Sequence, residues 1–177
     1  MRRLAVPLLC LAAAAVVAAT CAPLSSRAAE GELTPPAGKV VLIVSGHIAR
    51  TNGNGVASFD REMLERLGLR TVHTSTVWTE GVKDFEGPLV RDLLAAVGAD
   101  RATEVTASAL NDYVVVIPAA DFEKYGVILA LRMDGRELLA KDKGPVWIVY
   151  PRGDNPELQD ARYDNRWVWQ LNRLQVQ

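Results

Sequence analysis

Apolar residues along this chain gather in short uninterrupted or alternating runs more often than in the longer period of an amphipathic helix. Residues 39–45 form an uninterrupted run rich in Val and Ile, which predicts a buried β-strand. Similar runs predict further strands at residues 70–76, 104–110, 113–117, 127–133, 146–150 and 166–176. In the last of these, alternation would place Trp167, Trp169 and Leu171 on one face of the strand.

Two short helices are expected between the strands. Asp60 can cap a helix over residues 61–67, and Gly68 can end it. A second helix should open at Pro88, because the fixed φ of proline suits the first helical position, and it should stop at Gly98. The pattern therefore combines many strands with few helices.

Turn signals point the same way. Asp134 and Gly135 are typical of a two-residue β-hairpin turn, and the glycines within residues 51–55 predict a flexible loop. Many strands with few, irregularly placed helices favour the α+β class over a regular βαβ repeat. We expect a mixed, β-rich fold with few short helices.

The first residues have the features of an export signal. Arg2 and Arg3 precede an uncharged apolar stretch over residues 4–19, and small side chains near Ala28 suit cleavage after that residue. The apolar stretch is about four residues shorter than a membrane-spanning helix needs. We therefore expect no transmembrane helix in the mature chain.

This signal divides the chain into three predicted parts: a signal peptide at residues 1–28, an extended lead-in at residues 29–38 and a single domain at residues 39–177. The mature protein would be periplasmic or secreted. A lipoprotein anchored through Cys21 is the alternative, which the atypical Thr20 before the cysteine disfavours.

Charge and cysteine content narrow the classes of function. The full chain has a formal net charge of −1, and removal of residues 1–28 takes away three arginines and no acidic residue, which leaves −4. We therefore expect no nucleic-acid partner. The two cysteines, Cys10 and Cys21, both precede Ala28, so a domain released by cleavage there would contain no thiol.

A series of short motifs resembles the molybdopterin-binding domain of the sulfite oxidase family. The resemblance lies in the order and spacing of these segments, each of which is weak alone. They are WTEGV at residues 78–82, FEGPLVRDLL at 85–94, NDY at 111–113, IP at 117–118, LALRMDG at 129–135, KGP at 143–145, VYP at 149–151 and RWV at 166–168.

The resemblance implies a cysteine that this chain lacks. In that family a strand before these motifs ends in a cysteine whose thiolate binds molybdenum. The corresponding position here is Thr74, Ser75 or Thr76, with Ser75 the first choice as a metal ligand. A serine hydroxyl ionises far less readily than a thiol, and thiolate is the softer ligand. The alternative interpretation of the three hydroxyls, which we favour, is an exposed polar edge of a strand.

Four further residues are candidates for binding a molybdopterin cofactor or another small ligand. Tyr113 keeps a ring that resembles a substrate-contacting tyrosine of the family, and Lys143 stands where the family has a histidine. His73 lies beside Thr74 in the same predicted strand. Arg152 begins a charged segment, residues 152–166, which could form one wall of a pocket. The alternative interpretations are that His73 is an ordinary strand histidine, that the residues after Lys143 only form a turn, and that Tyr113 only begins a strand.

Three hypotheses about function remain open. The preferred one is an exported, molybdopterin-binding-domain-like protein that acts as a non-catalytic binding or accessory module, because the cysteine is missing. The second is a molybdenum-cofactor oxidoreductase with Ser75 or a neighbouring hydroxyl as the metal ligand. The third is a structural docking domain for a periplasmic or membrane partner.

Overall fold

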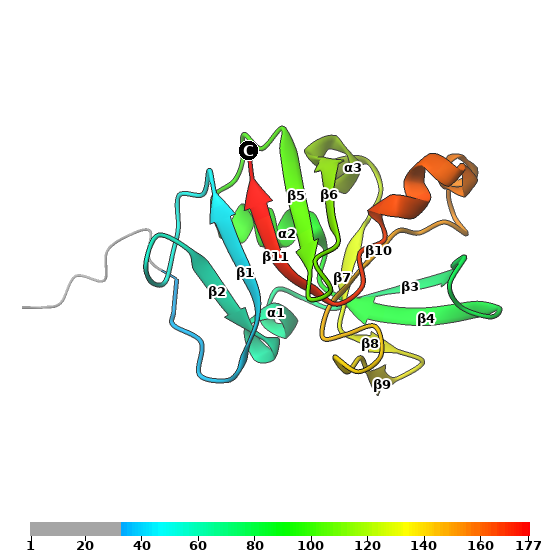
Figure 1. Ribbon diagram of the computed structural model, residues 1–177, viewed down its shortest axis with the longest axis horizontal. Helices are drawn as coiled ribbons and strands as arrows, with labels where there is room; N and C mark the ends of the chain where they lie inside the picture. Colours follow the sequence, from blue (N-terminus) through cyan, green and yellow to red (C-terminus); the bar gives the residue numbers. More distant parts are fainter. Residues whose placement is uncertain (1–32) are drawn as a thin grey trace, which may run out of the picture.

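The computed structural model describes residues 33–177, so the predicted signal peptide with Cys10 and Cys21 lies outside the described residues. Within them, the largest sheet has five strands, in the spatial order β2 (Ala57–Asp60), β1 (Val40–Gly46), β11 (Leu171–Val176), β5 (Glu104–Ala109) and β6 (Val114–Pro118). Strands β1 and β11 run parallel, and the other neighbours are antiparallel. The last strand therefore lies in the middle of the sheet, beside the first (Figure 1).

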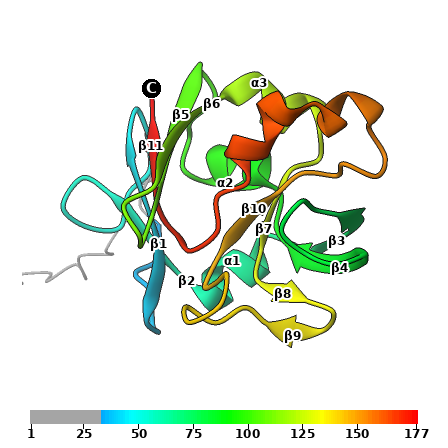
Figure 2. The same ribbon diagram turned by 45° about the vertical axis from the view of Figure 1, so that its right-hand side comes forward.

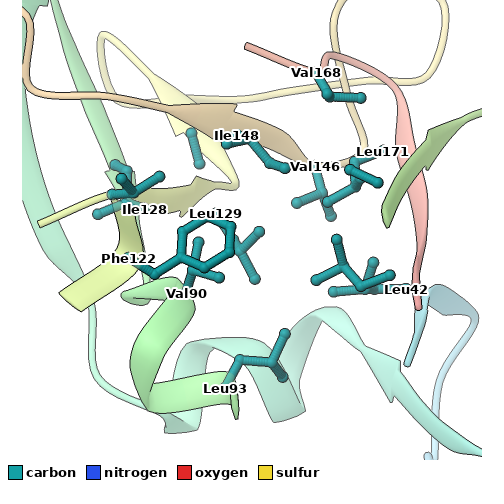
Figure 3. Close-up of a cluster of buried hydrophobic side chains, with 14 of the residues drawn as sticks. Leu42, Val90, Leu93, Phe122, Ile128, Leu129, Val146, Ile148, Val168 and Leu171 are labelled. Atoms are coloured by element: carbon teal, nitrogen blue, oxygen red, sulfur yellow. The ribbon is translucent and has the colours of Figure 1, made fainter. Parts of the chain in front are cut away.

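One face of this sheet is buried. Helices α1 (Arg61–Arg66) and α2 (Val90–Ala96) lie on that side, as does a two-stranded sheet of β7 (Ile128–Ala130) and β10 (Trp147–Val149) (Figure 2). Side chains from all these elements form the core, among them Leu42, Leu93, Leu129, Ile148 and Leu171, each with no exposed surface (Figure 3). On the opposite face, Val114 and Val116 of the edge strand β6 remain exposed.

A third sheet extends from the body of the molecule. It consists of β3 (Arg70–Ser75), β4 (Val82–Gly87), β8 (Arg132–Met133) and β9 (Arg136–Glu137), and the β3–β4 hairpin projects outward (Figure 1). Gly87 is required where this sheet meets β7, because a Cβ atom there would lie 1.9 Å from the Leu129 carbonyl oxygen. This close approach explains one glycine of the motif at residues 85–94.

Several predicted elements are confirmed. Strands β1, β3, β5 and β6 lie within a residue or two of their predicted ranges. The Asp60 carboxylate accepts a hydrogen bond of 2.8 Å from the Met63 amide and so caps α1. Asp134 and Gly135 have φ of 51° and 74° and connect β8 to β9, as a hairpin turn with two positive φ values requires. The α+β class is likewise confirmed.

The start of α2 differs from the prediction. The helix begins at Val90 with Leu89 as its N-cap, so Pro88 is not the first helical residue. Leu89 forms a β-bridge with Ile128, and the Pro88 carbonyl accepts a hydrogen bond from the Leu129 amide. Pairing with β7 therefore keeps residues 88–89 extended, and this tertiary contact overrides the local preference of proline.

The final strand is also shorter than expected. β11 begins at Leu171, whereas residues 167–170 are irregular and Gln170 has a φ of 52°. The amide of Ile148 donates to the carbonyl of Val168, which ties this segment to β10. Trp167 and Val168 are both buried although they are adjacent, so the predicted alternation is wrong over residues 167–170.

Two helical regions and two strands were not predicted. Helix α3 (Ala119–Lys124) follows β6 directly, and the charged segment after β10 forms the 3-10 helices η1 (Pro156–Gln159) and η2 (Ala161–Arg166). Strands β2 and β4 were missed. The predicted run at residues 127–133 divides into β7 and β8 around Leu131, whose amide donates to the Glu86 carbonyl.

Candidate functional site

The three candidate hydroxyls of β3 and its end do not face the same way. Thr74 and Thr76 are buried, with 1% and 8% of their surface exposed, whereas Ser75 is exposed. This alternation follows from the strand, in which successive side chains point to opposite faces. The interpretation as an exposed polar edge therefore holds for Ser75 and is wrong for Thr74 and Thr76.

Both buried threonines already have hydrogen-bond partners. The Thr74 hydroxyl accepts a bond of 3.0 Å from the Gly153 amide and donates one of 3.2 Å to the Ser75 carbonyl. The Thr76 hydroxyl accepts from the Trp78 amide at 3.0 Å and lies 2.9 Å from the Thr79 hydroxyl. Thr74 thus joins β3 to the start of the charged segment, and Thr76 shapes the turn after β3.

His73 lies on the exposed face of the β3–β4 hairpin. Its Nδ1 atom is 2.6 Å from Oδ1 of Asp84 on β4, and 73% of the imidazole surface is exposed. Ser75 belongs to the same face of the strand. These two candidates therefore lie apart from the buried side of β3, where Thr74 and Thr76 are found.

Arg152 and Tyr113 both contact the second 3-10 helix, η2. The guanidinium of Arg152 forms an ion pair of 3.1 Å with Asp164 and donates to the Gln159 carbonyl, and 17% of its side chain is exposed. The Tyr113 hydroxyl donates a hydrogen bond of 2.8 Å to the Asn165 carbonyl. The Tyr113 hydroxyl ties the loop to the residues before β6, whereas Arg152 joins two parts of the loop, and Tyr113 remains 41% exposed.

Lys143 contacts aromatic rings. Its ammonium lies 4.7 Å from the ring centroid of Trp169 and 5.3 Å from that of Trp147, both within the range of cation–π contacts. Trp169 is half-buried and Trp147 is fully buried. The lysine at the family's histidine position therefore covers part of an aromatic cluster.

An aromatic pocket of about 170 Å³ lies at this cluster. Three tryptophans and a tyrosine supply most of its wall, together with two amides and one carboxylate; the lining residues are Trp78, Asn111, Tyr113, Asp164, Asn165, Trp167 and Trp169. The rings of Trp78 and Trp169 meet at 72° with centroids 5.3 Å apart, and those of Trp78 and Trp167 at 52° with centroids 5.9 Å apart. Asp164 and Asn165 of the charged segment, residues 152–166, line this pocket, whereas the candidate Arg152 does not.

A buried polar network holds that wall in position. The Tyr150 hydroxyl donates a 2.9 Å hydrogen bond to Asp121 of α3, and Arg166 of η2 forms an ion pair with the same carboxylate. Burial, and then the negative charge of Asp121, raise the pKa of the Tyr150 hydroxyl, which therefore stays protonated and donates. The guanidinium of Arg166 also lies over the Tyr163 ring at 4.7 Å. Asp121 of α3 thus binds the loop to the core, whereas Arg152 contacts Asp164 and Gln159 of its own segment and closes the loop on itself.

Sequence reasoning identified Tyr113 but missed Trp78, Asn111, Asp164 and Asn165 as pocket residues. Of the two tryptophans that alternation placed on one face, Trp167 belongs to the core, with 2% exposed, whereas Trp169 is half-buried at the pocket. Trp78 belongs to the first quoted motif, WTEGV. Its position as an aromatic residue in a turn was the sequence feature that could have indicated a binding role.

Comparison with known proteins assigns the family. The model of the oxidoreductase molybdopterin binding domain matches residues 53–153. The chain belongs to this family. The match begins before Thr74 and ends at Gly153, so it covers β3, the quoted motifs up to VYP and the contact between Thr74 and Gly153.

Among solved structures, the chain is similar to the sulfane dehydrogenase SoxCD from Paracoccus pantotrophus, with a TM-score of 0.57 and 19% sequence identity. The similarity covers 76% of this chain and 37% of that chain, so this protein spans well under half the length of its structural relative. At this identity the likeness concerns the fold. A search of curated protein sequences finds no match.

The residues present do not fit a molybdenum cofactor bound in the manner the family implies. The inward hydroxyls of Thr74 and Thr76 are engaged by Gly153 and Trp78, and Ser75 points to the other face. Between residues 33 and 177, no group of three or more His, Cys, Asp or Glu side chains is arranged to hold a metal ion.

No helix in that same range is long and apolar enough to cross a membrane.

Proposed function

We propose that this protein is an exported, non-catalytic member of the molybdopterin-binding domain family that serves as a ligand-binding or accessory module. The observation that carries the proposal is the state of Thr74. Thr74 is the most deeply buried of the three candidate residues, and its hydroxyl is held between the Gly153 amide and the Ser75 carbonyl. A metal at this hydroxyl would have to displace the loop that begins at Arg152.

The aromatic pocket is the binding site that we assign to the module. Trp78, whose amide donates to the Thr76 hydroxyl, supplies one wall of the pocket. The other wall belongs to the loop, which Arg166 and Tyr113 hold to the rest of the molecule and Arg152 closes from within. Loops held on a rigid scaffold are the usual place for binding function. The fold would thus keep a ligand site next to β3, the strand that ends in a cysteine in the sulfite oxidase family, but would bind a different ligand there.

Metal analysis tests the non-catalytic proposal. The full chain, with its own N-terminus, is produced in a host that makes molybdenum cofactor and is grown with molybdate, and the purified protein is analysed for molybdenum and released pterin. We expect molybdenum far below one atom per chain. A molybdenum enzyme made in the same cells serves as the control for cofactor supply.

Stoichiometric molybdenum would contradict the proposal and favour the oxidoreductase hypothesis. In that case the Ser75→Ala and Thr74→Val variants identify the ligand, since the essential hydroxyl is the one whose removal abolishes metal binding. Full molybdenum occupancy in the Ser75→Ala variant would exclude Ser75 and direct attention to Thr74 and Thr76.

A further inference from the structure

The geometry of the aromatic pocket restricts the kind of ligand it can hold. The planes of Trp78 and Trp169 are at 72° to each other, which makes them adjacent walls of a corner rather than a stack. Trp167 adds a third ring at 52° to Trp78, and Tyr113 adds a fourth ring at the exposed side. Rings set at large angles around one small space are the arrangement of an aromatic cage, which binds methylated ammonium groups.

The pocket's size fits a small ligand. Its volume of about 170 Å³ is close to that of an engineered apolar cavity of about 150 Å³ that accommodates benzene in another protein. A ligand of about six or seven non-hydrogen atoms therefore fits on that scale. Larger ligands would have to project past the exposed ring of Tyr113 into solvent.

The aromatic rings favour a cation over a neutral molecule. The lining contains no basic side chain, its one carboxylate, Asp164, is paired with Arg152, and the Asn111 side-chain oxygen accepts from the Tyr113 amide. The faces of the aromatic rings carry negative electrostatic potential, and Lys143 already places its ammonium 4.7 Å from the centroid of Trp169. Lys143 does not line the pocket, so the positive charge nearest to Trp169 remains outside the space available to a ligand.

From these observations we propose that the pocket binds a small methylated ammonium compound, with the trimethylammonium group enclosed by Trp78, Trp167 and Trp169. Asp164 lines the pocket and is paired with Arg152, so it balances only part of the ligand's charge. This inference rests on the proposed function as a binding module and names the ligand class of that same site.

Paired ligands of equal shape test the role of charge. The purified full chain is titrated with choline and, separately, with 3,3-dimethylbutan-1-ol, in which a carbon replaces the charged nitrogen. Binding is followed by tryptophan fluorescence, since three of the four tryptophans line the pocket. We expect choline to bind at least about tenfold more tightly, as cation–π contacts with several rings imply.

Paired variants test the role of the rings. Trp78→Phe keeps an aromatic face, so it should retain the preference for choline, whereas Trp78→Leu keeps only apolar bulk and should lose most of it. Val77→Ala, at the exposed neighbouring position, is the control and should bind as the unchanged chain does. The melting temperature of each variant shows whether it is folded.

The outcomes separate the two proposals. Equal affinity for choline and the neutral alcohol would overturn the ammonium inference and leave a neutral-ligand module in place. Absence of choline binding at millimolar concentration, with the chain folded, would also overturn it. Stoichiometric molybdenum in the metal analysis would instead overturn the proposed function.

Discussion

Trp167 and Trp169 are two residues apart but have different surroundings. Trp167 is 2% exposed and contacts the rings of Trp147, Tyr150 and Trp78, whereas Trp169 is half-buried at the pocket. Trp167→Ala should therefore lower the free energy of unfolding by about 3–5 kcal/mol. Trp169→Ala should cost less, about 1–3 kcal/mol. Urea unfolding of both variants measures the difference, and equal losses would show that Trp169 belongs to the core as fully as Trp167.

Thr74 and Ser75 offer a second contrast between neighbours. Thr74→Val removes the acceptor of the Gly153 amide and should cost about 1–3 kcal/mol, because it leaves a part-buried N–H without its partner. Ser75→Ala should stay within about 0.5 kcal/mol of the unchanged chain, because Ser75 is exposed. Chemical unfolding compares the two, and a large loss for Ser75→Ala would mean that Ser75 has a structural contact that its exposure does not suggest.

Helix α1 depends on one buried carboxylate. Asp60 is 3% exposed, accepts from the Met63 amide at the start of the helix and also accepts from the Gly38 amide at 2.8 Å. Asp60→Ala should therefore lower the free energy of unfolding by about 1–2 kcal/mol. Asp60→Asn is the matched control, since asparagine keeps a capping oxygen. If Asp60→Ala were as stable as the unchanged chain, the cap would contribute nothing to the fold.

The same carboxylate should make stability depend on pH. Hydrogen bonds from the Met63 and Gly38 amides hold the pKa of Asp60 below its usual range. The folded state therefore favours the ionised form, so the stabilisation is complete above the unfolded pKa of about 3.9 and is lost as pH falls through the lower folded value. Between about pH 5 and pH 3, the unchanged chain should lose stability relative to Asp60→Asn. If the free energy of unfolding changed with pH by the same amount in both proteins over that range, this prediction would be wrong.

The elements that sequence predicted well are those whose signals are local. Asp60 caps α1 through residues next to it, and Asp134 with Gly135 turns a hairpin by its own backbone geometry. The prediction that α2 begins at Pro88 was wrong, because pairing with β7 decides the conformation of residues 88–89. The prediction for residues 167–170 was wrong for a similar reason, since the hydrogen bond from the Ile148 amide to the Val168 carbonyl fixes this segment against β10.

At the scale of the whole molecule, the pocket joins segments that are distant in the chain. Trp78 follows β3, Tyr113 precedes β6, and Asp164 to Trp169 precede β11. The family resemblance and the charged loop could be predicted from the sequence because each lies in ordered motifs or in composition. The meeting of these segments could not, since it depends on how β3 and β11 are placed by two different sheets.

The last prediction concerns the proposed export of the whole chain. Arg2, Arg3 and the apolar stretch at residues 4–19 precede Ala28, so a chain produced with its own N-terminus in an exporting bacterium should be cut after Ala28. Its intact mass should be that of a chain beginning at Ala29. The denatured protein should not react with a thiol reagent, because such a chain lacks Cys10 and Cys21. The Cys21→Ser variant should be processed identically.

The competing outcome is a lipoprotein. A mature N-terminus at Cys21 carrying a diacylglyceryl mass, lost in the Cys21→Ser variant, would replace release of the domain with attachment to a membrane surface. The pocket would then work at that surface, where a ligand with a trimethylammonium group can belong to a lipid headgroup as well as to a free solute. Intact mass of the two proteins therefore decides whether the binding module acts in solution or at a membrane.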